Sequence, residues 1–228
     1  MKEWENRKAW IAHFDILGFK NMLGNKGDSV PIAVLQSQID DALKLLSQKI
    51  DSFEEKIGYL VFSDTFILFS KTEYVNDYPA LISSAKHFIY SCLSMGLPVR
   101  GAISYGDTVF GHDNKILMGT AFLESHEYGE DQNWLGLILA PSATEELKLH
   151  HLFPERHGFV NCDLPLRRFS EFKSCLYAYK FINGSTSFEC PLLPKLNELM
   201  LRAPEEAKEK YSKTIEFIKQ NYVVKKNS

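Results

Sequence analysis

Phe14-Asp15-Ile16-Leu17-Gly18-Phe19 is the stretch of sequence on which the predicted fold depends. It overlaps a largely apolar run, residues 8–16, whose weak alternation predicts a strand buried on both faces of a sheet. A carboxylate at the end of a strand, followed by a glycine turn, can hold a cation while neighbouring backbone N–H groups face phosphates. The same Asp-x-x-Gly pattern also occurs in ordinary turns, so this motif alone leaves both interpretations open.

A second acidic turn follows downstream. Two β-rich runs, 59–62 and 65–69, are separated only by Ser63-Asp64, which is the spacing of a hairpin. We therefore expect Asp64 at the hairpin tip, next to the end of the first strand and close to Asp15. Two converging carboxylates repel each other unless a divalent cation lies between them, and Mg²⁺ is commonly held by one or two carboxylates plus phosphate oxygens.

The composition excludes several classes of protein. The 228 residues are 45% hydrophobic and carry a net charge of −3, which supports a large core and gives no footprint of a nucleic-acid binder. No signal-peptide pattern opens the chain, and no apolar run approaches the roughly 18 residues of a membrane span. We expect a cytoplasmic protein with reduced, structural cysteines, because these are sparse and lack C-x-x-C spacing: Cys92, Cys162, Cys175 and Cys190.

Periodicity and breaker residues predict the remaining elements. The expected helices begin within residues 28–31, near Leu81, after Gly119, at Ser142 with Glu145 as a capping box, and at Pro204. The expected strands cover 99–104 and 108–110 as a hairpin around Tyr105-Gly106-Asp107, then 135–140, 159–162 and 175–179. Gly101, inside a strand, indicates a close approach by another backbone or a ligand.

This order of elements predicts an α/β (α+β) fold. A mostly antiparallel sheet with helices packed on it is close to a ferredoxin-like core. We expect one domain over residues 1–228, with a core at about 8–182 and a C-terminal helical extension at about 204–221.

Four motifs together resemble the class III nucleotidyl cyclases over roughly residues 8–140. They are D-I-L-G-F at 15–19, S-D-T at 63–65, R-G-A-I-S-x-G at 100–106 and G-x-A-x-x-E from Gly119. The set is most similar to the Pycsar pyrimidine cyclases of bacterial anti-phage defence, which make cyclic UMP or cyclic CMP. The resemblance implies a class III cyclase core and conversion of UTP or CTP to the 3′,5′-cyclic monophosphate plus pyrophosphate.

The resemblance also implies roles for individual residues. Asp15 and Asp64 would bind two Mg²⁺ or Mn²⁺ ions with the Ile16 carbonyl, and backbone N–H groups of Leu17-Gly18-Phe19 would face the triphosphate. The ribose 3′-hydroxyl would attack the α-phosphate in line, so no protein nucleophile is needed. The family's active sites are shared across a homodimer, and a separate effector would respond to the product.

Two further residues are candidates for substrate contacts. Purine cyclases of the family usually carry a base-selecting lysine on the strand before the second aspartate, whereas here Lys56 is at the start of that strand and Tyr59 is within it. The resemblance implies that Tyr59 contacts the base and favours UTP, although strands are rich in tyrosine in any case. Arg100 would contact phosphate or base as a bidentate donor, or would be a surface arginine on a strand.

The sequence departs from the family after Gly119. The helix there lacks the family's Asn and Arg, and residues 123–127 are Leu-Glu-Ser-His-Glu. Positive charge at the α-phosphate would then come from Arg100 or from a partner chain, while Arg167-Arg168 is either a solvated loop or a triphosphate contact. Two alternatives remain open, namely an adenylate or guanylate cyclase and a catalytically inactive, nucleotide-binding regulatory domain with this fold.

Overall fold

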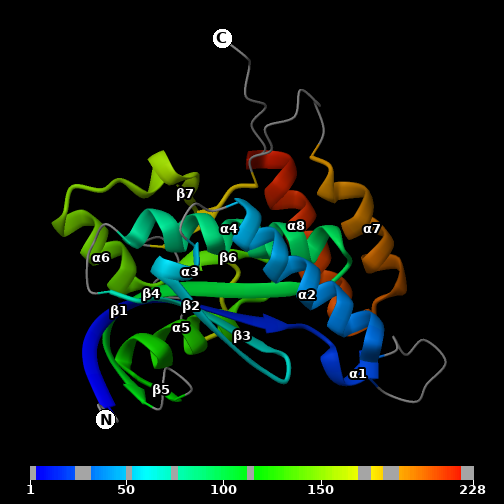
Figure 1. Cartoon of the computed structure of the whole chain (residues 1–228). Helices are drawn as coiled ribbons and strands as arrows, with labels where there is room; N and C mark the ends of the chain where they lie inside the picture. Colours follow the sequence, from blue (N-terminus) through cyan, green and yellow to red (C-terminus); the bar gives the residue numbers. More distant parts are fainter. Residues whose placement is uncertain are drawn as a thin grey trace.

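The computed structural model describes residues 4–23, 32–49, 53–72, 77–111, 116–168, 176–181 and 190–221. Its centre is an eight-stranded sheet with helices on both faces (Figure 1). The strands are β1 Trp4–Ile16, β2 Ile57–Phe62, β3 Thr65–Ser70, β4 Val99–Gly111, β5 Ile116–Gly119, β6 Leu137–Leu139, β7 Phe159–Asn161 and β8 Tyr177–Tyr179. The helices are α1 Phe19–Leu23, α2 Ile32–Lys49, α3 Phe53–Lys56, α4 Tyr78–Ser94, α5 Thr120–Asp131, α6 Pro141–Leu149, η2 Pro154–His157, α7 Leu192–Arg202 and α8 Glu205–Asn221.

The sheet has the order β2-β3-β1-β4-β6-β8-β7, and β5 pairs with β4. Among the described strands every pairing is antiparallel except that of β4 with β6. The expected α/β fold with a mostly antiparallel sheet is therefore confirmed. β1 lies between β3 and β4, which explains why its apolar run hardly alternates.

The two faces of the sheet carry apolar cores of different size, and the candidate site lies on the face with the smaller one. On one face, here called the α4 face, Trp10, Ala12 and Phe14 of β1 join a large apolar core with α2, α4 and α6. On the opposite face, the α5 face, Ile11 packs with Ala121 of α5 in a smaller core. Figure 1 shows α2 and α4 on one side of the sheet and α5 on the other. Side chains alternate along a strand, so Asp15 lies on the α5 face.

Several sequence expectations for local structure are confirmed. The Ser63-Asp64 hairpin joins β2 to β3, α5 begins after Gly119, and the terminal helix appears as α8. Gly101 is a point of close approach, because a Cβ there would lie 2.5 Å from Cδ1 of Phe14. The predicted helix start at 28–31 and Cys175 lie outside the described residues.

Two expectations are wrong. Tyr105-Gly106-Asp107 is no turn, because β1 extends back to Trp4 and pairs with β4 along the whole length of both strands. Ser142 does not form a capping box, since its Oγ contacts the Glu124 carboxylate and accepts a bond from the Tyr105 N–H. The helix α7, whose apolar side packs on α4 and α8, was not predicted from the sequence.

The described residues also bear on membranes and cysteines. Within the described ranges no helix combines the length and the apolar character needed to cross a membrane. Cys92, Cys162 and Cys190 are free thiols. Burial raises the pKa of the Cys162 thiol to about 11, with the charge of Asp163 adding to the effect, so this cysteine is predominantly protonated near neutral pH.

Candidate functional site

The end of β1 and the β2–β3 turn bring Asp15 and Asp64 together, as the sequence predicted. Asp15 pairs with Thr65 of β3 on one side and with Arg100 of β4 on the other. The Ile16 N–H donates to the Asp64 carbonyl oxygen over 3.0 Å, which fixes the turn against the end of β1. The negative charge of Asp64 contributes to raising the pKa of Asp15, so the two carboxylates interact.

Arg100 is held by Asp15 rather than left free for a ligand. Its Nε and Nη2 donate to Oδ2 of Asp15 over 3.2 and 3.0 Å, and its Nη1 donates to the Gln132 carbonyl over 2.7 Å. The residue is only 7% exposed. The expectation that Arg100 is a surface strand arginine is therefore wrong, and a phosphate would have to share this guanidinium with a carboxylate.

Burial dominates the electrostatics of this pair. It raises the pKa of Asp15 above its usual value, the charges of Asp64 and Glu130 raise it further, and Arg100 only partly opposes them. Burial also lowers the pKa of Arg100, against the influence of Asp15. A bound cation would relieve the desolvation cost of the Asp15 carboxylate.

The donor atoms at this site fit a hard divalent cation. Oδ2 of Asp15 accepts both Arg100 bonds, while Oδ1 and the Asp64 carboxylate have no hydrogen-bond partner among the described residues. Carboxylate and carbonyl oxygens are the ligands that Mg²⁺ and Mn²⁺ prefer. The part of the chain that the structure describes contains no group of three or more His, Cys, Asp or Glu able to hold a metal. Phosphate oxygens or water would have to complete the coordination.

The turn after β1 differs in one respect from the expected phosphate loop. The Leu17 N–H already donates to the Pro98 carbonyl over 2.8 Å, so this amide is not available to a phosphate in this structure. Gly18 has φ of +74°, and its carbonyl accepts the Met22 N–H of α1. The N–H groups of Gly18 and Phe19 lie before the first hydrogen bond of α1. Of the three amides expected to face the triphosphate, these two remain as donors.

Tyr59 does not lie on the same face as Asp15. It pairs with Leu68, which belongs to the core on the α4 face, and it is 50% exposed. Its neighbour Leu60 packs into the core on the α5 face. A base bound beside Asp15 would therefore approach Leu60 rather than Tyr59, and the predicted contact between Tyr59 and a base is not supported by this geometry.

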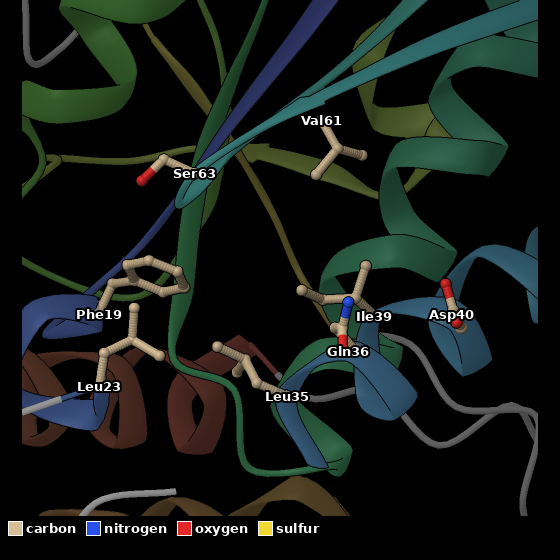
Figure 2. A pocket seen from close by; sticks show the side chains of 8 residues that line it. All are labelled: Phe19, Leu23, Leu35, Gln36, Ile39, Asp40, Val61 and Ser63. Carbon is tan, nitrogen blue, oxygen red and sulfur yellow. The ribbon is translucent and has the colours of Figure 1, made fainter. Parts of the chain in front are cut away.

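A pocket of about 300 Å³ adjoins the same turn from the α4 side (Figure 2). Phe19 and Leu23 of α1, Leu35 and Ile39 of α2, and Val61 give it a mainly apolar lining. Among the described residues that line the pocket, Asp40 is the one charged side chain. The described lining therefore offers a phosphate group no positive charge.

Several contacts around the site were not predicted from the sequence. His13 is buried on the α5 face, and its Nε2 is 3.3 Å from Nδ1 of His126 on α5. Burial, assisted by the charges of His126 and Arg100, lowers the pKa of His13 to about 3, so the ring is neutral. Strand alternation could have placed His13 beside Asp15, but it gives no indication of His126.

The loop after β7 is anchored to the end of α5. The Arg167 and Arg168 N–H groups donate to the buried Asp131 carboxylate over 3.0 and 2.8 Å. Nε of Arg168 forms an ion pair with the same carboxylate at 3.1 Å. Both arginines are exposed, but the loop is fixed and does not simply lie in solvent.

Comparison with known proteins identifies the fold. No protein-family model matches the chain, and no curated protein matches its sequence. Solved cyclase structures do match. The adenylyl cyclase CyaB from P. aeruginosa aligns with a TM-score of 0.50 at 14% identity, covering 64% of this chain and 83% of that chain. A dimeric guanylyl cyclase domain of the RhoGC fusion protein from the aquatic fungus Blastocladiella emersonii aligns with a TM-score of 0.55 at 11% identity. That alignment covers 78% of this chain and 96% of that chain.

A third match is the catalytic core of a rhodopsin–guanylyl cyclase with converted specificity, in complex with ATPαS. Its TM-score is 0.53 at 9% identity, and the alignment covers 64% of this chain and 84% of that one. At these identities the matches establish the class III cyclase fold and nothing finer.

Proposed function

We propose that this chain is a metal-dependent nucleotidyl cyclase that converts a nucleoside triphosphate to a 3′,5′-cyclic monophosphate and pyrophosphate. The observation that carries the proposal is the meeting of Asp15 and Asp64 at one end of a class III cyclase sheet, with Oδ1 of Asp15 and the Asp64 carboxylate unpartnered among the described residues. A pure scaffold has no need for two converging carboxylates, since the charge of Asp64 adds to the cost of ionising the partly buried Asp15.

In the proposed reaction the chain orients the triphosphate and holds the cations. Asp15, Asp64 and the Ile16 carbonyl would hold two Mg²⁺ or Mn²⁺ ions, which when bound supply charge stabilisation at the phosphates. The Gly18 and Phe19 N–H groups would bind phosphate oxygens. The ribose 3′-hydroxyl would release its proton to water as its oxygen forms a bond to the α-phosphorus. The bond from that phosphorus to the bridging oxygen would break, and pyrophosphate would leave with that oxygen.

The proposed substrate is a pyrimidine nucleotide, UTP before CTP. This proposal is supported by the residues of β2 that lie on the α5 face, which are Gly58, Leu60 and Phe62. None of the three is the base-selecting lysine that purine cyclases carry on this strand. As in the pyrimidine cyclases that the motifs resemble, the cyclic product would be a second messenger in anti-phage defence. We also propose a homodimer with shared sites, for which the dimeric guanylyl cyclase domain is a structural precedent.

A product assay tests the proposal. The purified chain is incubated with each of the four nucleoside triphosphates in Mn²⁺ and in Mg²⁺, and cyclic nucleotides are identified by mass spectrometry together with released pyrophosphate. We expect cyclic UMP, with less cyclic CMP. A purine product would retain the cyclase and overturn the pyrimidine preference. No cyclic product from any nucleotide, with phage-infected extract added as a source of activator, would contradict the cyclase.

A nucleotide-binding regulatory domain is the second candidate. Two observations favour it, namely the absence of the family Asn and Arg from α5 and the engagement of Arg100 by Asp15. Calorimetry with UTP and Mn²⁺ separates the two functions, because binding without turnover supports the regulator.

A further inference from the structure

The C-terminal helix α8 is attached to the segment that fixes Arg100. The Leu135 N–H donates to the buried Oγ1 of Thr214 over 2.8 Å, and that hydroxyl donates to the Lys210 carbonyl over 2.8 Å. Leu135 lies in the stretch 132–136, where the Gln132 carbonyl accepts from Arg100. Figure 1 shows α8 beside the end of the sheet where β1 reaches α1.

This attachment directs Lys210 toward the site. Residues four apart share a face of a helix, so Lys210 lies on the face that Thr214 turns toward the 132–136 segment. Lys210 is only partly exposed, and burial lowers its pKa. The charges of Arg100 and Arg167 lower it further, while the charge of Asp15 opposes them.

Lys210 differs from its neighbours Lys208 and Lys213 on α8 in making no ion pair within the described residues. Lys208 pairs with Glu205 at 2.6 Å, and Lys213 pairs with Glu209 at 2.7 Å. No ion pair or side-chain hydrogen bond of Lys210 is found within the described residues. A positive charge kept partly buried near two arginines costs stability, so its position calls for an anionic partner.

Arg167 approaches the same place from the loop after β7. Its Nε donates to the Asp131 carbonyl over 3.4 Å and its Nη2 to the Glu130 carbonyl. These partners are neutral carbonyls, whereas the Asp131 carboxylate pairs with Arg168. Arg167 and Arg100 thus donate to the carbonyls of the adjacent residues Asp131 and Gln132. The bond from the Leu135 N–H to Thr214 brings α8 to the same stretch, so the three cations lie near one another.

We propose that Lys210 and Arg167, with Arg100 behind them, bind the polyphosphate of the nucleotide within the same chain that holds the cations. This inference rests on the proposed function for the identity of the nucleotide and deepens it. The cluster supplies, from the C-terminal extension and the loop after β7, positive charge that α5 lacks. The simpler alternative is that Lys210 only covers apolar surface with its aliphatic stem.

The test compares charge variants on one helix. Lys210→Gln removes the charge and retains most of the stem, Lys210→Arg keeps the charge, and Lys219→Gln makes the same change at an exposed position nine residues further along α8. Arg167→Gln tests the second cation at an exposed site that does not depend on the packing of α8. Each is titrated with inorganic tripolyphosphate and with pyrophosphate, in Mn²⁺, by calorimetry, and KM and kcat are measured for the active nucleotide.

We expect Lys210→Gln and Arg167→Gln each to weaken tripolyphosphate binding by about 10-fold or more, because a charge-assisted contact is lost. KM should rise by a similar factor with a smaller change in kcat, and Lys210→Arg should restore binding. If Lys210→Gln and Arg167→Gln left the affinity for tripolyphosphate unchanged, or if Lys219→Gln weakened it equally, the proposed role of the cluster would be wrong. Wild-type turnover is a separate outcome, because binding without any cyclic product would refute the proposed function and leave the cluster standing.

Discussion

The two faces of the central sheet have the same strands but different chemistry. On the α4 face, Phe14, Phe66 and Phe88 pack within an apolar core that continues into α2, α6 and the C-terminal helices. On the α5 face, the same strands carry Asp15 and Arg100. The even-numbered residues Trp10, Ala12 and Phe14 of β1 thus serve the large core alone, whereas its other face packs Ile11 in a smaller core and carries Asp15 at the site.

The largest effect on stability is expected from Phe88→Ala on the α4 face. Phe88 is fully buried between Phe14 and Phe66, so the cavity should lower the free energy of unfolding by about 3–5 kcal/mol. Phe62→Ala is the matched control on the α5 face, where the side chain is 81% exposed and the change should stay within about 0.5 kcal/mol. Denaturant unfolding measures both, and equal losses would remove the distinction between the faces.

A smaller loss of stability is expected from Gly101→Ala. Its Cβ would lie 2.5 Å from Cδ1 of Phe14 and 2.6 Å from the His13 carbonyl, so the strands must shift and unfolding should become easier by about 1–3 kcal/mol. Gly106→Ala, on the α5 face of the same strand, meets its nearest atom at 3.1 Å and should cost less. A larger loss at Gly106 than at Gly101 in thermal unfolding would contradict the described packing.

The smallest effect, here on the choice of nucleotide, is expected from Tyr59→Ala. Because Tyr59 lies on the α4 face and is 50% exposed, its removal should leave the ratio of cyclic products from the four nucleotides unchanged. A change of that ratio, measured by mass spectrometry, would mean that the base reaches the α4 face and would restore the sequence-based assignment.

Much of the fold could be predicted because local signals agree with tertiary structure there. The Ser63-Asp64 spacing located the hairpin, and the apolar period of α4 located its buried side. β4 was divided wrongly because Gly106-Asp107 resembles a turn, whereas pairing with the long β1 keeps these residues extended. The helix α7 was missed although Leu192, Leu196 and Leu199 have helical spacing.

The site was predicted only in part. The two aspartates could be placed because strand ends and hairpin tips share a sheet edge, and their meeting follows from topology. Strand alternation, counted from Leu60 and Leu68, could have predicted that Tyr59 lies on the opposite face of the sheet from Asp15. Lys210 could not be found from local patterns, because its approach depends on how α8 packs against residues more than 70 positions earlier in the chain.

The most direct test of the central claim compares carboxylates on opposite sides of the sheet. Asp64→Asn is measured against Asp40→Asn, which makes the same change in the pocket on the α4 side. Both variants should unfold like the wild type, because the Asp64 carbonyl that binds Ile16 is retained and Asp40 is exposed. Metal-dependent cyclic nucleotide formation should fall by at least about 100-fold in Asp64→Asn and remain in Asp40→Asn. Full activity in Asp64→Asn, or loss only in Asp40→Asn, would contradict a catalytic site on the α5 face.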